Sequence, residues 1–118
     1  MANVYKNIQA TIDQAATDVD MYTSPAATTS IIKTIRIFNT HSGDLDVTST
    51  VYDASSTTNF EWDKTNVVAD NHANLLTYNN ILILEAGDIL KMQTPTINVV
   101  KMTASVLQIT RPPEVTTT

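Results

Sequence analysis

Hydrophobic and polar residues alternate along most of this chain with a period of two, which is the side-chain spacing of a β-strand. The clearest case is the segment 45–53, "LDVTSTVYD", in which the apolar residues fall on one face. The segment 4–12 shows the same alternation, and each of the two predicts a half-buried strand. No window carries the apolar stripe of a helix, because the run of helix-forming residues at 13–21 is short and interrupted.

The segment 30–40, "SIIKTIRIFNT", has apolar residues on both of its faces. Strict alternation places Ile31 and Ile35 together on one face, and it places Ile32 and Phe38 on the other. Strands that are apolar on both faces are usually covered on both sides, so we expect a central strand here.

Further strands are separated by short polar segments that contain turn-forming residues. The predicted strands are 19–23, 60–62, 66–69, 75–78, 81–84, 88–93 and 97–110, of which 60–62 and 66–69 are either short strands or irregular segments. The segments 40–44 and 70–74 are predicted to be turns. Together these elements predict an all-β fold, an antiparallel β-sandwich or jelly-roll-like single domain of about eight strands. Residues 1–111 form the predicted domain, and residues 112–118 form an extended C-terminal tail.

Composition limits the classes of function. The 118 residues suffice for one hydrophobic core. The net charge of −5 argues against nucleic-acid binding, which needs Lys and Arg to neutralise phosphates. Cysteine is absent, which excludes disulfides and thiol chemistry. The longest apolar run, Ile81–Leu84, is far shorter than the roughly 20 residues that span a bilayer, and no signal peptide is recognisable, so we expect synthesis in a cytoplasm.

Glu85 and Asp88 are the first candidates for catalysis, because they lie within a run of isoleucine and leucine. A catalytic pair needs two carboxylates that face one substrate across a cleft. The residues "EAGD" at 85–88 have instead the composition of a turn, in which Gly87 allows a tight reversal. We favour the turn, and we expect that replacing both carboxylates changes the free energy of unfolding by only about 0.5 kcal/mol, as surface substitutions do.

His41 and His72 are the two histidines, and both lie in polar segments. A metal site would require a third ligand at a recognisable spacing, whereas Asp44 and Asp70 near these histidines are ordinary turn residues. The sequence contains neither a nucleophile elbow nor a glycine-rich phosphate loop. We therefore predict no catalytic residue, no metal and no cofactor.

Phe60 and Trp62, in "NFEWDK", fall on the same side of an extended segment. Two interpretations stay open: the pair packs on the core, or it contacts a neighbouring subunit or a sugar, since Trp is frequent at interface hot spots. The tail "RPPEVTTT" is a second candidate interface. Arg111 can pair with an acidic neighbour, and the stiff Pro112-Pro113 pair lowers the entropy cost of docking.

Four segments of the chain, in this order, resemble small virion proteins of tailed bacteriophages, notably those of marine and cyanobacterial phages. They are "MANVYKN" at the start, "MYTSPAATTSIIKTIRIFNT" at 21–40, "LILEAGDILKMQ" at 82–93 and "VLQITRP" at 106–112. Such proteins combine a Tyr-Thr-x-Pro loop, an "I-V-K-x-I" strand ending in Asn-Thr, a "L-E-A-G-D" corner and a closing "I-x-R" strand. This chain departs from the pattern at Ala26-Ala27, where a glycine often follows the loop proline.

The resemblance implies a non-enzymatic bacteriophage virion structural protein present in many copies, without giving its position on the particle. Our first choice is a capsid decoration subunit that stabilises the particle through subunit contacts. The alternative is a neck, tail or fibre accessory subunit, including a glycan- or host-binding module that stacks Phe60, Trp62 and Tyr78 on sugars. The expected partners are further copies of the chain, as a homo-oligomer, and other virion proteins such as the major capsid or neck and tail proteins. Neither nucleic acid nor a membrane is expected as a partner, and the expected location is the virion, assembled in the host cytoplasm.

Overall fold

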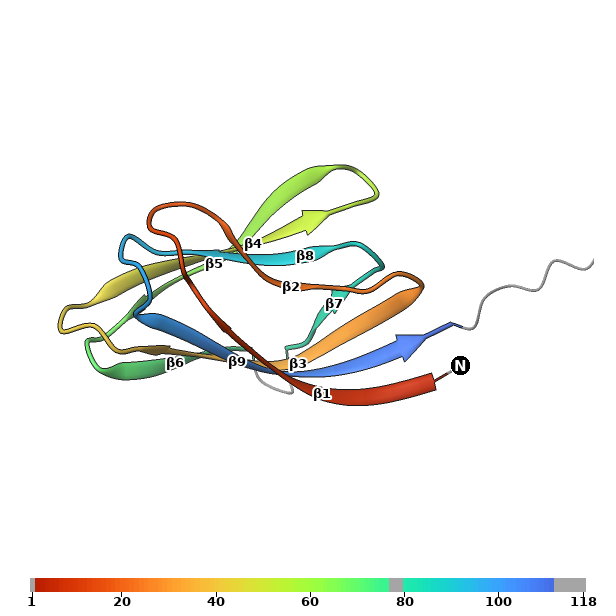
Figure 1. Ribbon diagram of the computed structural model, residues 1–118, viewed down its shortest axis with the longest axis horizontal. Coiled ribbons are helices and arrows are strands. Elements are labelled where there is room, and N and C mark those ends of the chain that lie inside the picture. The colour runs from red at the N-terminus through yellow and green to blue at the C-terminus, as the bar shows by residue number, and fades with distance from the viewer. Residues whose placement is uncertain (1, 77–79, 112–118) are drawn as a thin grey trace, which may run out of the picture.

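The computed structural model describes residues 2–76 and 80–111, and within these ranges it contains nine β-strands and no helix (Figure 1). The strands are β1 (Ala2–Thr11), β2 (Val19–Thr23), β3 (Thr28–Asn39), β4 (Leu45–Asp53), β5 (Thr58–Val67), β6 (Asn71–Leu76), β7 (Leu82–Leu84), β8 (Ile89–Gln93) and β9 (Val100–Thr110). The prediction of an all-β sandwich is confirmed. The predicted tail, 112–118, lies outside the described residues and stays a prediction.

The strands form two antiparallel sheets that face each other (Figure 1). Sheet A has the order β1-β9-β3-β6, with β7 also paired to β3, and sheet B has the order β2-β8-β4-β5. The pairs are nested around the β4–β5 hairpin: β3 pairs with β6 and β7, β2 with β8, and β1 with β9. This nesting is that of a long hairpin rolled up on itself, which is the topology of a jelly roll.

The hydrophobic core lies between the sheets and is built from alternate residues of each strand. In β9 the residues Val100, Met102, Ala104 and Val106 are buried, and the residues between them are exposed or half-buried. Burial of a valine or methionine side chain stabilises the fold by about 1.5–3 kcal/mol. The largest fully buried side chains are Ile12, Ile32, Ile35, Ile37, Val47, Val67, Leu84, Leu90, Met92, Val100, Met102 and Val106.

A β-bulge in β3 changes which isoleucines reach the core. The register between β3 and β9 shifts between Ile32 and Thr34, so Lys33 is the extra residue. As a result Ile32 and Ile35 are both fully buried, whereas Ile31 is half-buried on the outer face of sheet A. The prediction that Ile31 and Ile35 share a face is therefore wrong, because strict alternation does not hold across a bulge.

Three further predicted segments differ from the structure. The segments 60–62 and 66–69 fall mainly in one continuous strand, β5, which has a bulge opposite the middle of β4. The turn predicted at 70–74 is wrong, since β6 begins at Asn71 and pairs with the end of β3. Asparagine is rare in strands, so here pairing with a partner distant in sequence prevails over local propensity.

Candidate interaction surface

The residues Glu85–Asp88 form the predicted turn, which connects β7 and β8. The backbone N–H of Asp88 donates a hydrogen bond to the carbonyl oxygen of Glu85 over 3.0 Å. Gly87 has a φ of +86°, as the third residue of a type II turn requires. The two carboxylates nevertheless have different surroundings, because Glu85 is exposed and Asp88 is buried.

The Asp88 carboxylate holds two backbone donors in place. One oxygen accepts from the N–H of Ala54 over 3.0 Å, and the other accepts from the N–H of Glu85 over 2.9 Å. Asp88 thereby connects the β7–β8 turn to the loop of the β4–β5 hairpin. The expectation that both carboxylates can be replaced at the cost of a surface change is wrong for Asp88, since its removal leaves two N–H groups without an acceptor.

The two histidines lie in different surroundings. The Nδ1 atom of His41, in the β3–β4 loop, accepts a hydrogen bond from the N–H of Gly43 over 3.0 Å. His72 lies on β6 opposite Phe38 and is exposed. Among residues 2–76 and 80–111, no group of three or more His, Cys, Asp or Glu side chains could hold a metal ion. Within the same ranges there is no helix long and apolar enough to cross a bilayer.

The aromatic pair is divided between the core and the surface. Trp62, at the bulge of β5, packs against the core. Phe60 is 53% exposed, although its partner Val51 packs against the core. In Figure 1 the β4–β5 hairpin diverges from the rest of the sandwich, so sheet A leaves this end of the hairpin open. Core packing, the first interpretation, therefore fits Trp62. Contact with a neighbouring subunit or a sugar, the second interpretation, stays a prediction for Phe60.

Only one residue of the predicted tail interface is described. Arg111 is exposed directly after β9, and its backbone N–H donates to the carbonyl oxygen of Ala27 over 2.9 Å. Pro112, Pro113 and Tyr78 lie outside the described residues, so the contacts predicted for them stay predictions.

The outer face of sheet A carries apolar residues that align across four strands. They are Tyr5 on β1, Leu107 on β9, Ile31 on β3 and Ile83 on β7, which pair in this order. We call these four residues the apolar row. Tyr5 is 72% exposed and Ile83 is 55% exposed. Single exposed apolar residues are common on protein surfaces, but a contiguous group is typical of an interaction site.

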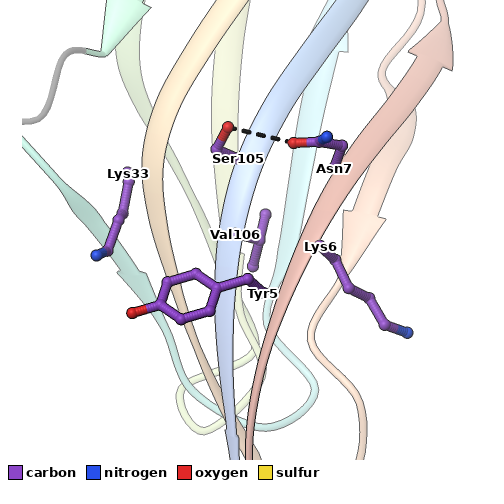
Figure 2. A pocket seen from close by; sticks show the side chains of 6 residues that line it. All are labelled: Tyr5, Lys6, Asn7, Lys33, Ser105 and Val106. Carbon is purple, nitrogen blue, oxygen red and sulfur yellow. Dashed lines mark hydrogen bonds between the residues drawn. The ribbon is translucent and has the colours of Figure 1, made fainter.

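Basic side chains lie beside the apolar row. The Nζ atom of Lys33 lies 5.2 Å from the centre of the Tyr5 ring, which is within cation–π distance. Figure 2 shows these two side chains at a shallow pocket that is also lined by Lys6, Asn7, Ser105 and Val106. Arg36 and Lys101 are exposed farther along β3 and β9 on the same outer face. The surface therefore combines an apolar part with several cations.

Charge is divided unequally between the sheets. The strands of sheet A hold four basic residues and no acidic one: Lys6, Lys33, Arg36 and Lys101. The strands of sheet B hold two basic residues, Lys64 and Lys91, and five acidic ones, Asp20, Asp46, Asp53, Glu61 and Asp63. In the part of the chain that the structure describes, the only ion pair joins Lys91 to Asp20, at 3.8 Å within sheet B. The cations of sheet A are therefore available to a partner.

Sequence reasoning did not find this surface. The alternation places Tyr5 on the polar face of its strand, but it groups Ile31 with Ile35 on one face, and the bulge at Lys33 that separates them is seen only in the strand register. A usable signal was the absence of Asp and Glu from several predicted strands. This absence indicates a basic surface only once the strands are known to form one sheet. The strands of that sheet are 2–11, 28–39, 71–76, 82–84 and 100–110.

No protein-family model matches the sequence, and no curated protein matches it. Solved structures match through their fold. A chain from Bacillus endospore appendages, which form disulfide-linked pili, is 12% identical with a TM-score of 0.52, over 93% of this chain and 89% of that chain. A chain of the virus-like particle of the extra small virus of the giant freshwater prawn Macrobrachium rosenbergii is 15% identical with a TM-score of 0.51, over 92% and 79%. At such identities the likeness shows the fold alone.

A further structure is less similar. The N-terminal modules of an endo-1,4-β-D-xylanase from Clostridium thermocellum are 10% identical with a TM-score of 0.40, over 97% of this chain and 27% of that chain. This likeness is too weak to bear on function.

Proposed function

We propose that the chain is a non-enzymatic structural subunit of a virus particle, and specifically a decoration subunit that stabilises a bacteriophage capsid. The observation that carries the proposal is the apolar row, with Lys33, Arg36 and Lys101 on the same face. A monomer in water gains nothing from exposing Tyr5 and Ile83, whereas a subunit buries such residues against its neighbour.

Two similarities support the same proposal. The four sequence segments resemble small virion proteins of tailed phages, and the jelly-roll topology is one that viral capsid domains use. Two of the matching solved structures are a chain of a virus-like particle and a chain of pili. In this proposal the partners are further copies of the chain and other virion proteins, such as the major capsid protein.

Mass spectrometry and cryo-electron microscopy of particles from the virus that encodes the chain test the proposal. A decoration subunit is expected in many copies, at symmetry-equivalent positions on the head. A few copies in the neck, tail or fibre would contradict the decoration role and support the accessory role. Absence from the particles would contradict both.

Binding to particles that lack the chain tests the surface itself. We expect that Ile83→Asp weakens this binding, because it places a carboxylate in the apolar row. Ile97→Asp is the matched control, since Ile97 is similarly exposed, at 49%, but lies in the β8–β9 loop. Equal binding by the two variants would show that the apolar row is not the contact.

A glycan-binding module is the second candidate. The exposed Tyr5 ring lies beside Asn7 and Ser105, whose polar groups can hydrogen-bond to sugar hydroxyls, and Phe60 offers another exposed ring. A glycan array probed with the wild type and with Tyr5→Ala tests this candidate. Binding that Tyr5→Ala removes would support it, and the absence of binding across the array would contradict it.

A further inference from the structure

The β4–β5 hairpin carries a second exposed surface, which is acidic and apolar. Between residues 49 and 63 the chain has three acidic residues and no basic one. Phe60 pairs with Val51, and Asp53 lies two positions beyond Val51, so Phe60 and Asp53 are diagonal neighbours on one face of the hairpin. Glu61 follows Phe60 on the edge strand β5 and pairs with Thr50, so it is exposed on the opposite face of the hairpin, and the two side chains flank the free edge of β5. We call Asp53, Phe60 and Glu61 the hairpin patch.

The hairpin patch is complementary to the outer face of sheet A. Phe60 is an exposed ring that can pack on the apolar row. The carboxylates of Asp53 and Glu61 have the sign opposite to Lys33 and Arg36, for which the described part of the chain offers no ion pair. Opposite charges around an apolar centre are the usual arrangement of a specific protein–protein contact.

One molecule cannot bring these two surfaces together. The hairpin belongs to sheet B, whereas the apolar row lies on the face of sheet A that points away from sheet B. Strand pairing holds each sheet together and the hydrophobic core packs the two sheets face to face, so the contact requires another molecule. A second copy of the chain carries both surfaces with the required chemistry.

We propose that the hairpin patch of one copy docks on the apolar row of the next, so that copies of the chain associate head to tail. The proposal rests on the proposed function as a particle subunit, and it names the partner and the surfaces of that subunit. Because the contact joins two different surfaces, it is heterologous and generates a ring or an open array. Electrostatic attraction sets its orientation and weakens as salt screens the charges.

Mixing two variants tests the proposal. The row variant carries Lys33→Glu and Ile83→Asp, and the hairpin variant carries Phe60→Asp and Glu61→Gln, so that the two altered surfaces repel each other. Each variant alone is expected to be monomeric in analytical ultracentrifugation, at concentrations where the wild type associates. An equimolar mixture is expected to form heterodimers that contain one copy of each variant. The row variant still has an unaltered hairpin patch, and this patch can dock on the unaltered apolar row of the hairpin variant. These dimers cannot grow further, since their remaining surfaces are both altered.

A weaker substitution and a control extend the test. Phe60→Ala is expected to raise the dissociation constant of self-association by about tenfold or more, as for a residue at the centre of a contact. The control variant carries Lys64→Glu and Ile97→Asp, which are the same chemical changes at positions outside both surfaces. It is expected to associate like the wild type. Thermal melting of each variant shows whether it is folded, and only folded variants are compared.

Several results would overturn the head-to-tail contact. One is self-association of the hairpin variant at wild-type strength. That result is expected if the apolar rows of two copies pack against each other across a two-fold axis, without the hairpin. Another is a mixture that stays monomeric, or a wild type that does not associate. If the chain is nevertheless found in particles, the subunit role stands and only the contact is wrong. Head-to-tail association of a chain that is absent from particles would instead refute the proposed function and leave the contact in place.

Discussion

The carboxylate of Asp88 accepts a hydrogen bond of 3.0 Å from the backbone N–H of Ala54 and so fixes the β4–β5 loop to the β7–β8 turn. We expect Asp88→Ala to lower the free energy of unfolding by about 1–3 kcal/mol, because two backbone donors lose their acceptor. Glu85→Ala, in the same turn but exposed, is expected to change it by no more than about 0.5 kcal/mol. Urea unfolding measures both, and equal effects would contradict the assignment.

Gly87 is expected to tolerate no side chain without loss of stability. Its φ is +86°, and a Cβ atom there would lie 3.2 Å from the Cβ of Ala54. Gly87→Ala should therefore destabilise the protein by about 1–2 kcal/mol. Gly43→Ala is the control, because the nearest atom to its added Cβ, in the His41 ring, lies at an ordinary 3.4 Å. A melting temperature that falls as far in the control would argue against backbone strain at Gly87.

The bulge at Lys33 predicts losses of different size for two adjacent isoleucines. Ile32→Ala should reduce the free energy of unfolding of the isolated domain by about 2–5 kcal/mol, since Ile32 is fully buried. Ile31→Ala should have a much smaller effect, because Ile31 is half-buried on the outer face. Chemical denaturation of the two variants decides between this register and strict alternation with both faces covered, which predicts losses of similar size.

The last residue of β4, beside the hairpin loop, is a carboxylate with a perturbed pKa. The Ser55 hydroxyl donates a hydrogen bond of 2.7 Å to Asp53, and this bond is the main cause that lowers the pKa of Asp53. Since the pKa is lowered in the folded state, the stabilising contribution of the carboxylate is complete above the unfolded pKa and is lost as pH falls through the folded one. Ser55→Ala should raise the pKa toward its ordinary value of 3.8. A carboxyl NMR titration with no shift between wild type and variant would contradict this prediction.

The segment 112–118 is predicted from the sequence to be an arm that contacts a neighbouring subunit. We expect its deletion to leave the melting of the isolated domain nearly unchanged, because β9 ends at Thr110 and Arg111 is already bonded to Ala27. The same deletion should weaken incorporation into particles or self-association. Large destabilisation of the domain with unchanged assembly would show that the segment packs on its own domain.

The alternating pattern predicted the strands well where a sandwich imposes one buried and one exposed face. The segment 45–53 coincides with β4, and 19–23 coincides with β2. It failed where a partner distant in sequence decides the structure. β6 is a strand because β3 lies beside it, and the bulge at Lys33 appears only in the register between β3 and β9.

The candidate surface depends on the same non-local information. Tyr5, Leu107, Ile31 and Ile83 are adjacent only because four strands lie in a particular order. The structural role of Asp88 similarly depends on Ala54, which reaches it through the fold of sheet B. The sequence showed that residues 85–88 form a turn, because turn chemistry is local, but it did not show what the carboxylate binds.

The nested pairing of the strands has a consequence for how the protein acquires its structure during synthesis. β1 and β9 pair along their whole length, from Ala2 with Thr110 to Thr11 with Lys101, and β9 also lies between β1 and β3. The β4–β5 hairpin can close early, since its strands are neighbours in the chain, whereas sheet A is incomplete until β9 has left the ribosome. Such a high contact order implies slow folding. Until β9 is inserted, β1 and one edge of β3 present open backbone groups to other nascent chains, so β9 insertion is the step at which a chaperone would protect this protein from aggregation.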